Sequence, residues 1–290
     1  MNDLAILLHP PRATPRWWRL VSLYPIGVAG AVLCVLILAA AVLAPWMTPY
    51  DPIGVNLEEK LLPPSRAHWF GTDEAGRDLL TRVIYGARYS LLIAVGIVLS
   101  SALFGTLLGG VAGLSGGRLD SILMRITDVA MSFPYFIPAL VIAMILGPST
   151  RSLIIALAVV WWPSYVRIVR GRVLEIRHEL FVEAARALGA TSSRVLLKHV
   201  LPQCSRPIQV KISTDLGHAL IAATSLSFIG LGVQPPLPEW GNLIAVARLY
   251  ALEAWWYAVF PGIVVTVTVL AMTTVADMMI RFVDPIARVG

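Results

Sequence analysis

Charged residues are scarce in this sequence, and cysteine is almost absent. Asp, Glu, Lys and Arg together make up 14% of the 290 residues, whereas 57% are hydrophobic and the mean hydropathy is +0.76. So little polar sequence cannot cover the surface of a water-soluble domain of this size, which excludes a soluble globular protein. The two cysteines, Cys34 and Cys204, lie in segments of different character, so we expect no disulfide. The composition indicates a membrane protein.

A phosphate-binding GxxxxGK(S/T) motif is also missing from the sequence. A transport process driven by ATP would therefore take its energy from a separate protein. We expect no catalytic site, no metal and no cofactor in this chain.

Long apolar runs are what the sequence has instead. Crossing a bilayer takes about 20 apolar residues as a helix, and four windows contain no Asp, Glu, Lys or Arg: Tyr24 to Pro45, Tyr89 to Leu114, Val129 to Thr150 and Ala254 to Ala276. Two weaker runs span residues 152–166 and 212–234, the latter interrupted by Asp215 and His218. The first run is longer than the apolar part of a cleaved signal peptide, so we favour a retained helix. These runs predict an all-α polytopic membrane protein with six transmembrane helices and both termini on one side.

Residues 167–206 interrupt this apolar pattern. Placing their eight basic residues and three Glu in lipid would cost on the order of 30 kcal/mol, so the segment lies outside the bilayer. With six crossings, the face opposite to it receives seven of the 23 basic residues, which are Lys60, Arg66, Arg77, Arg82, Arg88, Arg151 and Arg248. The positive-inside rule then makes the segment and both termini cytoplasmic. The net charge of +6 needs no nucleic acid to explain it, because topology and anionic lipid headgroups suffice.

These assignments divide the chain into consecutive parts. They are a cytoplasmic tail (1–23), a first transmembrane helix (24–45), a periplasmic segment (46–88), a core of five transmembrane helices (89–284) and a C-terminal tail (285–290). The core contains the cytoplasmic loop 167–206 and a periplasmic loop, 233–256. Prolines in the periplasmic segment favour extended loop, while residues 73–86 have helical spacing.

The cytoplasmic loop has the pattern of two short helices. Residues 177–188 predict a helix with Phe181, Ala185 and Leu188 on one face, and Gly189 suits a left-handed helix end. Thr191 or Ser192 would cap a second helix that runs to Leu201 and ends at Pro202. That helix presents Val195, Leu196 and Leu197, which disfavours a DNA-reading role. The loop is predicted to be a compact knob held out to a soluble partner.

The motif EAARALG, followed after twelve residues by Pro202, resembles the EAA loop of permease subunits of bacterial ABC importers. The stretches FGTDEAGRDLLTRVIYGARYSL, LDSILMRITDVAMSFP, WWPSYVRIVRGRVLEIR and SLSFIGLGVQPPLPEWG are similar to the C-type subunit of the dipeptide/oligopeptide/nickel permeases, and the resemblance covers about residues 25–285. The chain departs from many relatives at His199, Gln203 and Ala223.

The resemblance implies a type I ABC importer permease in the bacterial cytoplasmic membrane. Its expected partners are a B-type permease subunit, two ABC ATPases that bind ATP and Mg²⁺, and a periplasmic substrate-binding protein. The implied solute is a dipeptide or oligopeptide, with nickel or another small solute as the alternative. By resemblance, ATPase docking falls to Glu183, Ala184, Ala185, Leu188, Gly189, Ala190, Leu201 and Pro202. A secondary transporter is the more distant alternative, and the inverted repeats that it predicts are not apparent.

Ionisable residues within the apolar runs are candidates for the translocation path. They are Asp128, Asp215, His218 and Asp277, all near the cytoplasmic ends of their helices in this topology. Snorkelling, or pairing with Arg125, Lys211 or Arg281, is the favoured interpretation, and lining of a weakly polar passage is the alternative. Gly105, Gly109, Gly110 and Gly113 have near-helical spacing that suits close helix packing.

Overall fold

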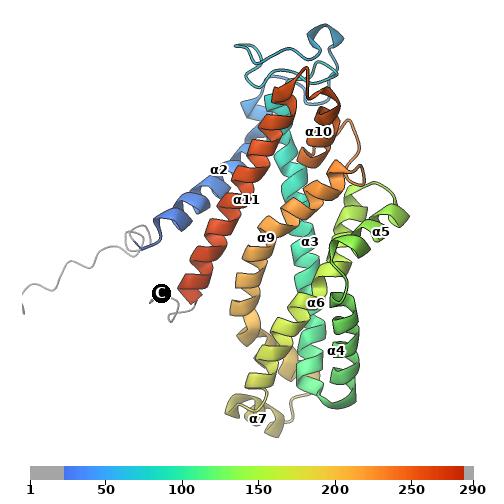
Figure 1. Cartoon of the computed structure of the whole chain (residues 1–290). Helices are drawn as coiled ribbons and strands as arrows, with labels where there is room; N and C mark the ends of the chain where they lie inside the picture. Colours follow the sequence, from blue (N-terminus) through green and yellow to red (C-terminus); the bar gives the residue numbers. More distant parts are fainter. Residues whose placement is uncertain (1–22, 284–290) are drawn as a thin grey trace, which may run out of the picture.

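The computed structural model describes residues 23–283 of the chain (Figure 1). Within this range the protein is built of helices and loops without a β-strand, so the predicted all-α class is confirmed. The helices are α2 (Pro25–Met47), α3 (Leu79–Ser115), α4 (Gly117–Met131), α5 (Phe136–Leu146), α6 (Thr150–Ile176), α7 (Leu180–Ala187), α8 (Ser192–Arg194), α9 (Ser205–Phe228), α10 (Trp240–Ala247) and α11 (Trp255–Val283). Apart from Leu23, the predicted tails, with Arg12, Arg16, Arg19 and Arg288, lie outside the described residues.

Four helices of the described range, α2, α3, α6 and α11, are long and apolar enough to cross a membrane. The predicted crossing at 212–234 falls on α9, which starts earlier, at Ser205, and is not among them. The first half of α9 carries Arg206, Lys211 and Asp215. Helix α9 nevertheless runs along the bundle beside α3 and α11 (Figure 1).

The predicted third crossing, 129–150, is not a continuous helix. It is divided between α4 and α5, which meet at an angle of 88°. Pro134 lies in the break, and proline restricts the residue before it to extended backbone. Counted as one span, this bent pair brings the number of candidate crossings to five.

Helices α3 and α6 make the most extensive contact of any helix pair in the described residues, and a row of glycines lies between them. A Cβ atom at Gly105 would lie 2.5 Å from the Trp162 carbonyl oxygen, and one at Gly109 would lie 2.6 Å from the Val166 carbonyl oxygen. Gly113 meets Val173 in the same way. The close packing predicted from these glycines is confirmed, and their lack of a side chain lets the two backbones approach.

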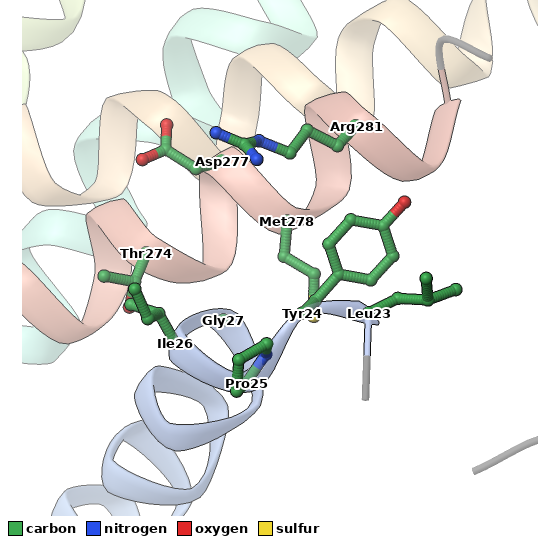
Figure 2. Close-up of a pocket in the computed structure, with 9 residues that line it drawn as sticks. All are labelled: Leu23, Tyr24, Pro25, Ile26, Gly27, Thr274, Asp277, Met278 and Arg281. Carbon is green, nitrogen blue, oxygen red and sulfur yellow. The ribbon is translucent and has the colours of Figure 1, made fainter. Parts of the chain in front are cut away.

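Helix α2 stands to one side of the bundle and packs against α11 through small residues. Gly27 faces Met278 and Gly30 faces Thr274 on α11, so a Cβ at either glycine would clash. Figure 2 shows the start of α2 beside the last turns of α11, where a cavity of about 170 Å³ is lined by both helices and by Asp277 and Arg281. Helix α2 is thereby fixed to the C-terminal end of α11.

One end of the bundle is covered by a layer that we call the platform, made of residues 48–78 and 229–254 (Figure 1). Asp73, fully buried, accepts hydrogen bonds from Arg77 Nε and Arg82 Nη1, both at 2.7 Å. Asp78 caps α3 by accepting from Thr81 N at 2.8 Å, which is why the helix begins at Leu79. Helix α3 therefore starts within the segment that the sequence assigned to the periplasm.

Candidate functional site

The opposite end of the bundle is a protrusion of residues 177–204, which we call the knob (Figure 1). Helix α6 ends at Ile176 and α7 follows after three residues. Gly189 has φ of +83°, so the left-handed conformation predicted for it is confirmed. Thr191 caps α8 by accepting from Arg194 N at 3.4 Å. A short helix and a glycine turn thus make the tip of the knob.

The helix predicted over residues 177–188 is shorter, Leu180–Ala187, and packs by one face. Val182 and Ala185 pack inward against a small core formed with α6 and the chain after α8, whereas Leu188 is 88% exposed and Phe181 is 41% exposed. Val182 and Ala185 are three residues apart and therefore share one face of the helix. Of the three residues predicted to share a face, Ala185 is therefore in the core of the knob, and Phe181 and Leu188 are exposed. Large apolar side chains are left at the tip of the knob.

The second helix of the knob does not end at Pro202. After α8 the chain forms a π-helical turn (Val195–Val200) and a 3₁₀ turn (Leu201–Cys204), and it continues directly into α9. Pro202 lies in the first turn of the 3₁₀ segment, where its missing N–H costs no hydrogen bond. The predicted helix stop is wrong, and the knob is joined to α9 without a flexible loop.

The predicted docking residues divide into two groups. Glu183, Ala184, Leu188, Gly189 and Pro202 are exposed, whereas Ala185 is buried and Ala190 and Leu201 are partly buried in the core of the knob. A Cβ at Gly110 of α3 would lie 3.0 Å from both Leu196 and Leu201. The second group therefore holds the knob against α3 and α6.

Cys204 lies in the same small core and is fully buried. Burial raises the pKa of its thiol, which keeps it in the unreactive protonated form. Cys34 lies in α2, far along the chain, and both cysteines are free, as expected.

Asp128 is separated from Asp215 and His218. It pairs with Arg167 at 2.7 Å, and both side chains are about half exposed. Its partner is thus on α6 and not Arg125, which the sequence offered. Asp120 and Arg170 make a second, bidentate pair between α4 and α6, at 2.5 and 2.7 Å. These pairs fix α4 to α6.

Asp215 and His218 line one cavity of about 470 Å³. The cavity lies between α6, α9 and the break between α4 and α5, and its other polar and aromatic lining residues include Phe133, Tyr135, Trp161, Ser164 and Lys211. Lys211 Nζ donates to Asp215 Oδ1 at 2.6 Å, which confirms the pairing favoured from the sequence. The sequence did not predict Tyr135 and Trp161 as lining residues, because no periodic pattern shows that a cavity forms beside a helix break.

Comparison with known proteins decides the family. The model described as the inner membrane component of binding-protein-dependent transport systems matches residues 105–289, which include the knob and the cavity. The chain belongs to this family. A second model, the N-terminal transmembrane domain of oligopeptide transport permease C, matches residues 17–64. This membership makes the chain a multi-pass inner-membrane permease subunit of an ABC importer.

Curated relatives of this permease cover nearly its whole length. The probable D,D-dipeptide transport system permease protein DdpC of Escherichia coli strain K12 is 41% identical over 90% of this chain and 88% of its own. The dipeptide transport system permease protein DppC of Bacillus subtilis strain 168 is 37% identical over 93% of this chain and 85% of its own.

A solved structure shares the fold of this permease. It is the methionine ABC transporter MetNI in inward-facing conformations, with a TM-score of 0.53 at 19% identity over 71% of this chain and 98% of the solved chain. The type I permease fold expected from the resemblance is confirmed.

Proposed function

We propose that this chain and a second permease subunit form the membrane passage of an ATP-driven importer of dipeptides or oligopeptides. Its relatives in Escherichia coli and Bacillus subtilis carry dipeptide transport in their names. A periplasmic binding protein delivers the peptide, and two separate ATPases bind ATP and Mg²⁺. The observation that carries the proposal is the knob, which exposes apolar side chains on a rigid continuation of two long helices.

The knob has the surface of a docking element. Leu180 is 81% exposed and Leu188 is 88% exposed, and Ala184 beside them is small enough for a partner to approach the backbone. Neighbouring exposed apolar side chains commonly mark an interaction site, and a helix face of this kind fits a groove. In the cytoplasm, where the basic residues of the loop place it, that partner is the ATPase.

The connections of the knob suit the transmission of movement. Its core contains Val169 and Val173 of α6, and its far end continues into α9. A displacement of α7 would therefore move α6 and α9 together instead of being absorbed by a loop. Both of these helices line the cavity that contains Asp215. Opening and closing of the passage would follow from ATP-driven movement of the knob.

Replacement of one exposed leucine tests the docking role. Leu188→Asp places a charge on the knob without removing a core side chain, so we expect the permease to reach the membrane while the ATPases no longer co-purify with it. Leu252→Asp is the matched control, because Leu252 is fully exposed on the platform at the other end of the molecule. Unchanged ATPase co-purification with Leu188→Asp, at normal amounts of permease, would sink the proposal.

A further inference from the structure

A cavity of about 390 Å³ lies among α2, α3, α9 and α11 and is separate from the candidate site. Three of these helices, α2, α3 and α11, are long and apolar enough to cross a membrane, so the cavity lies at the depth of the lipid chains. Most of its lining side chains are hydrocarbon, as at Leu91 on α3 and Leu216 on α9, and none of the described residues that line it is charged. It is an apolar space within an apolar solvent.

The polar atoms of the lining already have their hydrogen bonds. Thr268 Oγ1 donates to the Val264 carbonyl oxygen at 2.7 Å, and Ser213 Oγ donates to the Gln209 carbonyl oxygen at 3.0 Å, each within its own helix. Cys34 adds a thiol, which behaves as a small apolar group. An occupant of this cavity would find few groups to pair with its own donors or acceptors, which disfavours a peptide or water.

Helix α2 spans the cavity because it is held on both sides of it. Near its start, α2 packs so closely against α11 that a Cβ at Gly30 would lie 2.8 Å from the Ala271 carbonyl oxygen. Near its end, Arg88 Nη2 of α3 donates to the Val42 carbonyl oxygen at 2.9 Å. The part of α2 that lines the cavity, residues 31–38, lies between these two contacts. Closing the cavity by an inward movement of α2 would break them.

The dimensions of this space favour a lipid chain over a protein helix. A helix with its side chains is about 10 Å across, and the contacts of Gly30 and Arg88 hold α2 too close to α11 and α3 to admit one. An empty cavity is unfavourable as well, because its walls lose dispersion contacts. Apolar cavities of about 150 Å³ already take up molecules such as benzene. A hydrocarbon chain is narrow and flexible, and it is the solvent at this depth.

We propose that this cavity is a binding site for one acyl chain of a membrane phospholipid. The chain passes beside α2 and contacts Leu216 of α9 and Met272 of α11. Both of these side chains are partly buried in the hydrophobic core, so the cavity is the route by which lipid reaches them. Helix α9 continues into the knob without a loop, so the bound chain touches an element connected to the knob.

A photoactivatable lipid tests the site. The full chain, isolated from membranes with the subunits that remain bound to it, is placed in phosphatidylcholine nanodiscs that contain a small fraction of phosphatidylcholine with a diazirine in one acyl chain. After illumination, mass spectrometry of peptides locates the adducts. We expect adducts at Leu216 or Met272, inside the cavity. Adducts are also expected at Val35, which is 65% exposed on α2 and outside the cavity lining.

Matched phenylalanine substitutions on α2 separate the bound chain from surrounding lipid. Ala31→Phe places a ring inside the cavity, so the adducts at Leu216 and Met272 should be lost while those at Val35 remain. Val35→Phe places the same ring on the outer face of α2, and the adducts at Leu216 and Met272 should persist. Ser213→Leu fills the cavity from the opposite wall and should have the same effect as Ala31→Phe.

Several outcomes would overturn the site. They are the absence of adducts at Leu216 and Met272, adducts there that survive both Ala31→Phe and Ser213→Leu, and unfolding of both filling variants, which would mean that the space is already occupied by protein. Inner adducts that form in the isolated chain but not with partner subunits bound would assign the cavity to a protein partner instead. The measurement involves no transport, so a failure of the proposed function leaves its result standing.

Discussion

Charged pairs are buried on the platform of this molecule and more exposed between α4 and α6. On the platform, Asp73 is fully buried between two arginines. The aromatic side chains of Trp240 and Tyr257 are also buried at this end of the molecule. Between α4 and α6, the Arg167–Asp128 pair is about half exposed, and at the tip of the knob Leu188 is 88% exposed. Both ends also carry exposed apolar side chains, Leu252 on the platform and Leu188 on the knob, so the buried ion pairs of Asp73 are what distinguish the platform.

The difference predicts where each end derives its stability. A buried carboxylate with two guanidinium partners is strongly coupled to the fold, because removal of one member leaves buried charge behind. An exposed pair is screened by water and contributes little. The platform is therefore the fixed end of the permease, and the knob is the end built for exchange of contacts.

The largest expected effect on stability comes from the replacement of Asp73. Asp73→Ala leaves Arg77 and Arg82 buried without their shared partner, and the free energy of unfolding should fall by about 3 to 5 kcal/mol. Asp128→Ala, the matched change at the exposed pair between α4 and α6, should lower it by under about 1 kcal/mol. Thermal unfolding in detergent measures both, and equal effects would remove the distinction between the two ends.

The packing of α3 against α6 connects the two ends. Replacement of a glycine at this contact is the next test. A Cβ at Gly109 would lie 2.6 Å from the Val166 carbonyl oxygen, so Gly109→Ala should cost about 1 to 3 kcal/mol of folding stability. Gly171→Ala on α6 meets nothing within 4 Å and should be neutral or stabilising. If Gly109→Ala unfolds at the same temperature as the parent, the two helices are not in rigid contact.

The smallest expected effect concerns pH at the platform. Glu239 is buried and caps α10, accepting from Gly241 N and Asn242 N at 2.9 Å and from Ser90 Oγ at 3.2 Å. Burial raises the pKa of its carboxyl group despite these hydrogen bonds. The folded protein therefore holds this proton to higher pH than the unfolded chain, so stability falls as pH rises from about 4.3 through the raised value.

Glu239→Gln should remove this part of the pH dependence. The substitution also removes one carboxylate oxygen from the helix cap, which should lower the free energy of unfolding by about 1 kcal/mol at every pH. The slope of the unfolding temperature against pH is the quantity to compare, with Glu183→Gln on the exposed face of the knob as the control. An unchanged slope in Glu239→Gln would show that this carboxyl group titrates alike in both states.

Long uncharged runs and a glycine row were sufficient to predict the helical class and close helix packing at α3, whereas the identity of its partner, α6, came from the structure. The break between α4 and α5 was not predicted, because residues 129–150 are apolar throughout and the composition of a run does not reveal a turn inside it. Pro134 was the available signal, since proline disfavours helix in the residue before it.

In the candidate site, the type of a residue was a better guide to its structure than its place in a periodic pattern. Gly189 was placed correctly, because few residues other than glycine adopt a positive φ. The sequence did not reveal which side of α7 packs inward, because an eight-residue helix gives too few turns for periodicity to fix its rotation. The pairing of Asp128 with Arg167 joins residues 39 apart, which only the folded arrangement reveals.

The central claim is that the tip of the knob couples the permease to its ATPases, and Gly189 tests it most directly. Gly189→Val forces a branched side chain into a left-handed conformation at the tip, while Gly147→Val does so at φ of +77° on the loop before α6. Neither position has an atom within 4 Å of an added Cβ. We predict that cells carrying Gly189→Val lose ATP-driven dipeptide uptake at normal membrane levels of the permease, whereas Gly147→Val retains it; full uptake with Gly189→Val would contradict the account.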